Sequence, residues 1–183
     1  MTDKSKLRTE IKRRIKSIGS DLRNTYSKQI YENLINLPEY VKSKKIFIYI
    51  SFDSEVHTAD IIEHSLKSRK RVFVPYIRAN SMEMLEIDLK SYFTTNNLGI
   101  VEPVYSRDNL YTGDIDFAVM PLIGYDNNLN RLGRGGGFYD KFLKGRNCIK
   151  AAVAFTAQQA DKLPVEPHDI KADIIVTEKG IIR

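Results

Sequence analysis

Residues 45–50 read Lys-Ile-Phe-Ile-Tyr-Ile, a short apolar run rich in β-branched and aromatic side chains, which is typical of a buried strand. Residues 71–75, Arg-Val-Phe-Val-Pro, repeat that character. Between the two runs, Ile61 and Leu66 follow Thr58 at the spacing of a helix that Thr58 caps. A strand, a helix and a second strand in this order predict a β-α-β unit with parallel strands and a right-handed crossover.

The alternation of helices and strands continues on both sides of this unit. Two helices with apolar stripes precede it, the first over Leu7 to Ile18 and the second ending before Pro38. Further strands are expected at residues 82–87, 116–121, 149–155 and 174–177, whereas residues 88–113 are polar and weakly patterned. We therefore expect residues 1–183 to form a single α/β domain, with a mostly parallel central sheet flanked by helices in a Rossmann-like three-layer arrangement. Ligands of such folds bind outside the carboxyl ends of the strands, where residues 51–55 and the loop after Pro121 lie.

The composition limits the classes of partner. The net charge is +6 and much of the excess lies in the first helix, which a polyanionic small ligand explains as well as nucleic acid does. Basic and aromatic residues are not interleaved in a nucleic-acid-binding motif, so we expect no nucleic-acid partner. No apolar run reaches the roughly 18 residues that span a bilayer, and no signal peptide is recognisable. The one cysteine, Cys148, excludes an internal disulfide and fits a reducing cytoplasm. We also expect a monomer without a membrane partner.

Residues 131–140 read Arg-Leu-Gly-Arg-Gly-Gly-Gly-Phe-Tyr-Asp and hold four of the chain's ten glycines. Glycine allows positive φ and lets backbone N–H groups approach a ligand closely. A helix is expected to begin at Phe138, so the loop would present N–H groups to an anion such as phosphate. Arg131 and Arg134 add fixed positive charge. Asp140 would repel phosphate, and its expected companion is therefore a divalent cation.

Other interpretations of this loop stay open at the level of pattern. A glycine triplet also fits a tight bend without a ligand. The loop is neither a Walker loop, because no Gly-Lys-Ser/Thr follows, nor a dinucleotide fingerprint, because the spacing differs. A phosphosugar isomerase or CoA-transferase relative, and a nucleotide- or RNA-binding module without catalysis, would also use an anion-binding loop on this scaffold.

Several segments taken together resemble the 5-formyltetrahydrofolate cyclo-ligases, also called methenyltetrahydrofolate synthetases. The resemblance rests on the glycine loop and on motifs that occur in the family's order along nearly the whole chain: residues 4–8, 51–58, 120–121, 124–126, 130–140 and 164–173. It implies that 5-formyltetrahydrofolate and ATP, with Mg²⁺, give 5,10-methenyltetrahydrofolate, ADP and phosphate. The formyl oxygen would be phosphorylated and the folate N10 would then attack the activated carbon, which requires mainly orientation and electrostatics from the protein.

The resemblance also implies roles for individual residues. Contacts to ATP fall on the first helix and the glycine loop, at Lys4, Arg8, Arg131, Leu132, Gly133, Arg134, Gly135, Gly136, Gly137, Phe138 and Tyr139. Contacts to the folate fall on Ile50, Phe52, Glu55, Phe138 and Tyr139. Asp140 and Asp169 would hold Mg²⁺, and Arg134 and Tyr139 would act in catalysis.

Taken without the resemblance, these residues have plainer explanations. Lys4 and Arg8 lie four apart and share a helix face that could be solvated, and Asp169 could be a loop or cap residue. The chain also departs from the family at Phe138, where the family often has tyrosine, and at Gly136, where a lysine can stand. We therefore expect Phe138 to make contact without a hydroxyl hydrogen bond.

Overall fold

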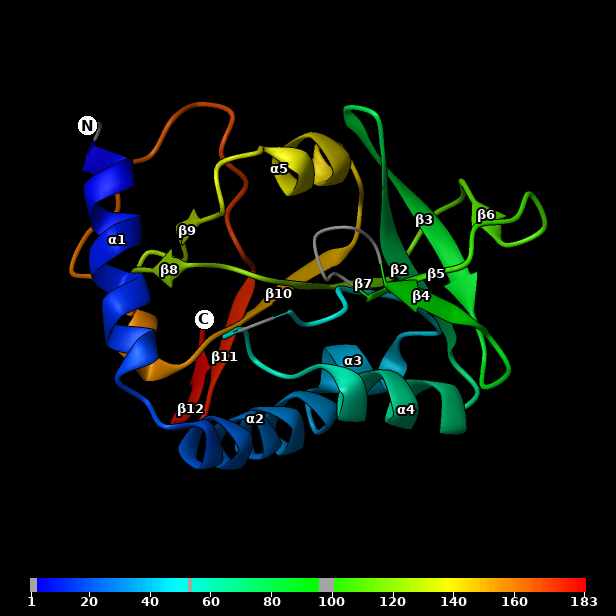
Figure 1. Cartoon of the computed structure of the whole chain (residues 1–183), viewed down its shortest axis with the longest axis horizontal. Coiled ribbons are helices and arrows are strands. Elements are labelled where there is room, and N and C mark those ends of the chain that lie inside the picture. The colour runs from blue at the N-terminus through cyan, green and yellow to red at the C-terminus, as the bar shows by residue number, and fades with distance from the viewer. Residues whose placement is uncertain (1–2, 53, 96–100) are drawn as a thin grey trace.

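The structure is a computed structural model, and it describes residues 3–52, 54–95 and 101–183. Its centre is a sheet of eight strands (Figure 1). Across the sheet the strands are β12 (Gly180–Ile182), β11 (Ile174–Thr177), β10 (Ile149–Val153), β7 (Phe117–Met120), β1 (Lys45–Ile48), β2 (Arg71–Arg78), β3 (Ser81–Ile87) and β6 (Leu110–Tyr111).

Five neighbouring strands of this sheet are parallel, from β11 through β10, β7 and β1 to β2. The antiparallel strands β12 on one side, and β3 and β6 on the other, complete its edges. The predicted β-α-β unit is confirmed as β1, α4 (Ala59–Lys67) and β2, with Ile46 opposite Val72. The mostly parallel α/β architecture expected from the sequence is therefore correct.

Alternate residues of the central strands enter two separate apolar clusters, one on each face of the sheet. Ile46 and Ile48 pack with α2 (Ser20–Ile35), α3 (Pro38–Lys42) and α4, whereas Phe47 packs with α5 (Phe138–Leu143) on the other face. Figure 1 shows α2, α3 and α4 below the sheet and α5 above it. Strands buried on both faces explain the nearly continuous apolar runs in the sequence.

Helix α1 (Asp3–Lys16) stands beside the sheet, with Ile11 and Ile15 buried against the α2 side of the core. It packs next to the short 3₁₀ helix η1 (Thr156–Gln158). This position brings the first turns of the chain to the end of the molecule where residues 131–137 lie. No helix in the described part of the chain is long and apolar enough to cross a bilayer.

The structure differs from the sequence-based expectations in local details. The stretch 88–113 holds three short strands, β4 (Phe93–Thr95), β5 (Val101–Pro103) and β6, while its residues 96–100 lie outside the described part. The loop before the glycines contains a hairpin of β8 (Gly124–Tyr125) and β9 (Arg131–Leu132). Thr58 does precede α4, but its hydroxyl donates to the carbonyl of Tyr49 and does not cap the helix.

Candidate functional site

The site lies where the chain reverses its direction of travel across the sheet. From β1 the chain crosses through α4 to β2 on one side, and from β7 it crosses through α5 to β10 on the other. The connections after β1 and β7 therefore diverge and leave a crevice, which is the usual ligand position in open α/β sheets. A cavity of about 690 Å³ opens there, large within the roughly 300–1,000 Å³ typical of ligand pockets.

Every residue that the sequence analysis assigned to ATP, folate or metal lines this one cavity. They come from α1, the loop after β1, the glycine loop, the start of α5 and the segment near residue 169. The structure thus brings together all the predicted positions. The chemical role of each one stays a prediction.

The opposite wall of the cavity was missed by sequence reasoning. It is apolar and is formed mainly by Pro75, Ile77, Met82 and Val101, from β2, β3 and β5. Strand β2 continues to Arg78 instead of ending at Pro75, and its antiparallel pairing with β3 carries Met82 to a position opposite Ile77. The available signal was that the apolar run continues past Pro75 through Tyr76 and Ile77.

The glycine loop needs glycine at two of its positions. Gly135 has a φ of 109° and Gly137 has a φ of 64°, both in a region that other residues rarely adopt. Helix α1 holds the loop from the other side, because the Arg8 Nε donates to the Gly133 carbonyl at 2.8 Å. A Cβ added at Gly135 would lie 3.6 Å from the Arg8 guanidinium, so the loop backbone passes directly beside that cation.

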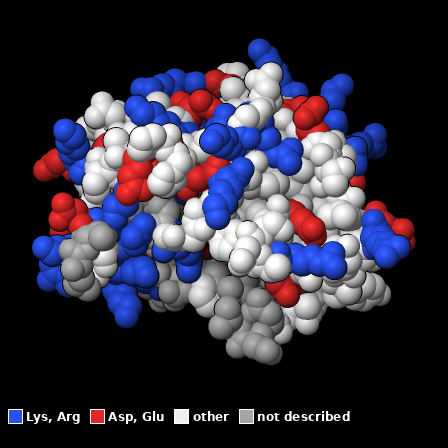
Figure 2. Space-filling model, turned by 90° about the horizontal axis from the view of Figure 1, so that it is seen from above, with Lys and Arg blue, Asp and Glu red and all other residues white. Residues whose placement is uncertain are grey.

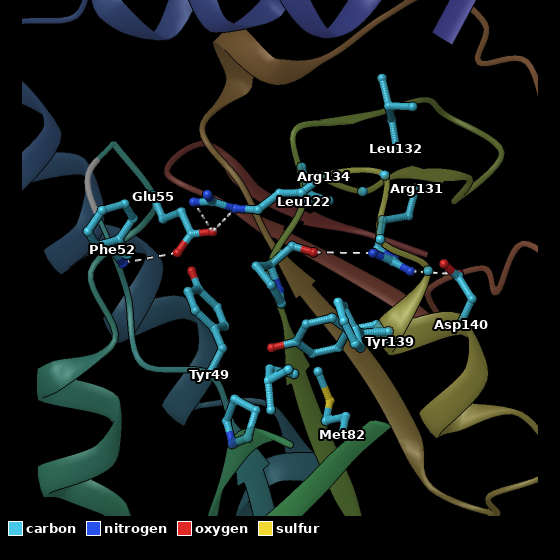
Figure 3. A pocket seen from close by; sticks show the side chains of 18 of the residues that line it. Tyr49, Phe52, Glu55, Met82, Leu122, Arg131, Leu132, Arg134, Tyr139 and Asp140 are labelled. Atoms are coloured by element: carbon cyan, nitrogen blue, oxygen red, sulfur yellow. Dashed lines mark hydrogen bonds and ion pairs between the residues drawn. The ribbon is translucent and has the colours of Figure 1, made fainter. Parts of the chain in front are cut away.

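Arg131, at the start of the loop, is an internal residue. Its side chain is 3% exposed, and its Nη2 donates to Asp140 Oδ1 at 2.7 Å. The same carboxylate oxygen accepts the backbone N–H of Ile170 at 3.0 Å. Arg131 and Asp140 therefore tie β9, α5 and the segment around residue 170 together beneath the loop (Figure 3).

Arg134, three residues later, points across the cavity instead. Its Nε and Nη2 both donate to Glu55 Oε1, at 3.1 and 2.8 Å, and its Cζ lies 5.9 Å from the centre of the Phe52 ring. The other Glu55 oxygen accepts the Phe52 N–H at 3.0 Å. A residue predicted to meet folate and a residue predicted to meet phosphate are thus paired with each other (Figure 3).

Two tyrosines face the middle of the cavity. Tyr49 donates its hydroxyl to the Val56 carbonyl at 2.8 Å. Within the described residues, the Tyr139 hydroxyl has no hydrogen-bond partner, and Figure 3 shows it directed into the cavity. Burial, together with the negative charge of Glu55, raises the pKa of Tyr139 above its ordinary value. Tyr139 is therefore a neutral hydroxyl that is free to donate to a ligand.

Asp169 lies at the rim beside α1. Lys4 Nζ is 2.7 Å from Asp169 Oδ2 and 3.3 Å from Glu166 Oε2. Burial raises the pKa of Asp169, but the hydrogen bonds from Lys4 and from the Glu166 N–H outweigh burial and hold it below the ordinary value. Among the described residues, Glu166, His168 and Asp169 form the one group of metal-ligand atoms within 4.8 Å of one another, and Asp140 is not a member of it.

The surface around the site carries both signs of charge. Figure 2, which views the molecule from the α5 side, shows Lys and Arg interspersed with Asp and Glu. Some of these charged residues form ion pairs at the cavity, such as Lys4 with Asp169 and Arg134 with Glu55. The excess positive charge is therefore partly matched by carboxylates where the cavity opens.

Comparison with known proteins identifies the relatives of this chain. The family model described as the 5-formyltetrahydrofolate cyclo-ligase family matches residues 1–178. This chain belongs to that family. A mouse protein named 5-formyltetrahydrofolate cyclo-ligase is 32% identical, with 94% of this chain and 92% of the relative covered. One of the same name from Escherichia coli K12 is 30% identical, with 93% and 98% covered.

Solved structures agree with the family membership. The NMR structure of Aquifex aeolicus 5,10-methenyltetrahydrofolate synthetase superposes with a TM-score of 0.87 at 31% identity, covering 100% of this chain and 93% of the other. The chain is therefore a ligase of folate metabolism, with 5-formyltetrahydrofolate cyclo-ligase activity. Family membership favours this chemistry over the isomerase, CoA-transferase and RNA-binding alternatives.

Proposed function

We propose that the enzyme uses ATP and Mg²⁺ to cyclise 5-formyltetrahydrofolate to 5,10-methenyltetrahydrofolate, with release of ADP and phosphate. The observation that carries the proposal is that one cavity has two unlike walls. One wall is the glycine loop with the cations of α1, and the other is apolar. A phosphate chain suits the first wall, and the flat, largely apolar body of a folate suits the second.

The reaction proceeds in two chemical steps. The formyl oxygen attacks the γ-phosphorus of ATP, the bond to ADP breaks, and the formyl group becomes an imidate phosphate. The folate N10 then attacks the activated carbon, the C–O bond breaks, phosphate departs, and the N10 proton is lost to solvent. Both steps depend on holding the formyl group between the γ-phosphate and N10, which is an orientation task.

The charged wall binds and orients the phosphates. Lys4, Arg8 and the N–H groups between Gly133 and Gly137 hold the triphosphate, with Leu132 and Phe138 packed beside it. Arg134 stabilises the charge on the phosphoryl group during transfer. Arg131 supports this loop from within, through its contact with Asp140. The neutral Tyr139 hydroxyl donates a hydrogen bond to the formyl or phosphoryl oxygen.

The folate lies against the loop after β1. Glu55 accepts the N–H edge of the pterin ring, because a carboxylate is an acceptor for adjacent donors. Ile50, Phe52 and Phe138 pack on the ring faces. Phe138 has no hydroxyl, so its contribution is contact alone.

The two aspartates fit a magnesium ion in donor chemistry. Carboxylate oxygens are the ligands that Mg²⁺ takes from proteins. In the described structure, Asp140 Oδ2 accepts no hydrogen bond, and Asp169 Oδ1 has only the His168 ring, 3.9 Å away. Asp140 and Asp169 would hold the ion, which when bound neutralises charge on the phosphates.

We further propose that the enzyme works as a cytoplasmic monomer. Cys148 is buried, and burial raises the pKa of its thiol above the ordinary value. It therefore behaves as a small apolar residue, which is compatible with a reducing compartment.

A spectroscopic assay tests the proposed reaction. Protein, Mg-ATP and 5-formyltetrahydrofolate are mixed, and the methenyl chromophore is followed. We expect the chromophore only when ATP and Mg²⁺ are both present, with one ADP formed for each methenyl product. Product formed without ATP, or ADP formed without product, would refute the proposed mechanism.

A further inference from the structure

The ion pair between Glu55 and Arg134 occupies groups that two different ligands need. Glu55 offers its carboxylate to the N–H edge of the folate in the proposed function, and Arg134 offers its guanidinium to phosphate. In the structure, Arg134 Nε and Nη2 both donate to Glu55 Oε1. Each group therefore satisfies the other until a ligand replaces it.

The two partners differ in freedom. The Glu55 side chain is only 13% exposed, and its second oxygen is fixed by the Phe52 N–H, whereas the Arg134 side chain is 52% exposed. The Arg134 guanidinium can thus be solvated by water or bind a phosphate once it has left Glu55. Glu55 remains in place, largely desolvated, and loses its main counter-charge when Arg134 leaves. An unpaired carboxylate in such a position is unfavourable.

We propose that the Glu55–Arg134 pair is a latch that couples the two substrates, so that each one raises the affinity of the other. This inference rests on the proposed function. A folate N–H edge at Glu55 replaces the hydrogen bonds of Arg134 and frees the guanidinium for phosphate. A nucleotide that binds first must draw Arg134 away and leave Glu55 without that counter-charge. The folate therefore removes a cost that the nucleotide alone would bear.

Linkage makes this coupling measurable in both directions. If folate increases nucleotide affinity by a given factor, nucleotide increases folate affinity by the same factor. Allosteric couplings usually change an affinity by about 5–150-fold. Because only the one ion pair between Glu55 and Arg134 is involved, we expect a change of about tenfold. A saturating concentration of either ligand also removes the molecules in which Glu55 and Arg134 are paired with each other.

Calorimetric titration tests the latch. The β,γ-imido analogue of ATP is titrated with Mg²⁺ into the full chain, with and without saturating 5-formyltetrahydrofolate, and the reciprocal titration is then made. The wild-type protein should show about a tenfold ratio between the two nucleotide dissociation constants.

Glu55→Gln supplies the decisive comparison. It should weaken the folate, tighten the nucleotide analogue measured alone, and bring the coupling ratio close to one. A structural defect would weaken both ligands, so tighter nucleotide binding is the distinctive result. Glu63→Gln is the matched control, because Glu63 forms an exposed ion pair with Lys67 on α4, away from the cavity. It should leave all the constants unchanged.

The outcomes separate the latch from the proposed function. Independent binding of both ligands to the wild-type protein, or an unchanged coupling ratio in a folded Glu55→Gln variant, would overturn the latch alone. Failure of the wild-type protein to bind either ligand would overturn the proposed function and the latch with it.

Discussion

The two arginines of the glycine loop, Arg131 and Arg134, lie in opposite environments. Arg131 is 3% exposed and is held by Asp140 beneath the loop, whereas Arg134 is 52% exposed and reaches across the cavity. The two arginines are three positions apart, yet one is held inside the protein and the other is exposed in the cavity. The comparison teaches that two arginines of one glycine loop can have very different side-chain environments.

The difference follows from the backbone. Arg131 lies in β9, where pairing with β8 fixes its direction toward α5. Arg134 lies after the strand, in the part of the loop where glycine permits positive φ at Gly135. The β8–β9 hairpin therefore fixes the position of the loop, and the glycine segment that follows brings Arg134 to the cavity.

The largest expected effect is at the exposed arginine. Arg134→Ala should lower the single-turnover rate by roughly 10³-fold or more, because such arginine contacts strengthen in the phosphoryl-transfer transition state. Nucleotide affinity should change much less, since the loop N–H groups remain. Arg183→Ala is the matched control: Arg183 is 53% exposed and pairs with Glu39 outside the cavity. Normal turnover of Arg134→Ala at saturating ATP would remove its catalytic role.

Removing the contact between Arg131 and Asp140 should lower the stability of the protein. Asp140→Ala should lower the free energy of unfolding by about 3 kcal/mol, because it leaves a buried guanidinium without its counter-charge. Urea denaturation measures this loss.

Asp140→Asn keeps an acceptor oxygen for Arg131, so its stability loss should be smaller while turnover is nearly abolished. If a folded Asp140→Asn variant turns over normally at ordinary Mg²⁺, Asp140 is an anchor and not a metal ligand.

A pair of glycines isolates the cost of backbone strain from the effect on the site. Gly137 and Gly145 both have positive φ, 64° and 75°, and a Cβ at either meets nothing within 4 Å. Gly137→Ala and Gly145→Ala should therefore each lose about 1–2 kcal/mol of stability. Only Gly137→Ala should also weaken the nucleotide analogue. Equal effects on binding would mean that the loop conformation does not matter to the ligand.

The smallest effect is expected at the rim pair of Lys4 and Asp169. Because the pKa of Asp169 is lowered in the folded protein, its contribution to stability is present above the ordinary value of 3.8 and is lost as pH falls through the lower folded value. Asp169→Asn should cost below about 1 kcal/mol near neutral pH, as a partly exposed pair does. Unfolding curves on both sides of pH 3.8 should converge for the two proteins at the acid end.

Much of the fold could be predicted because its strands are buried on both faces. The apolar runs at β1 and β2, and the helical spacing between them, lead directly to parallel pairing. Strands β4 and β6 were harder to predict, because both are short, β4 is exposed, β6 is only half-buried, and their residues carry little periodic signal. Pairing with β3, and not local propensity, makes β6 a strand.

The membership of the site was predictable, but its internal pairing was not. Motifs placed Glu55 and Arg134 in one site, yet nothing local relates residues 79 positions apart. Likewise, Arg131 and Arg134 look alike in sequence, and the β8–β9 pairing and the contact of Arg131 with Asp140 distinguish them only in the folded protein. The part of the apolar wall that β2 and β3 form arises from an extension of the sheet that a strand ending at Pro75 would not have produced.

The contacts of α1 also have a consequence for how the molecule is made. Arg8 meets Gly133 and Lys4 meets Asp169, which are separated by 125 and 165 residues along the chain. Helix α1 therefore cannot complete these contacts until segments far along the sequence from it are in place. Contacts between residues so far apart form late, because closing a long loop costs chain entropy before the contact can stabilise the fold. The cavity should thus be among the last parts to assemble, after the sheet on which it rests.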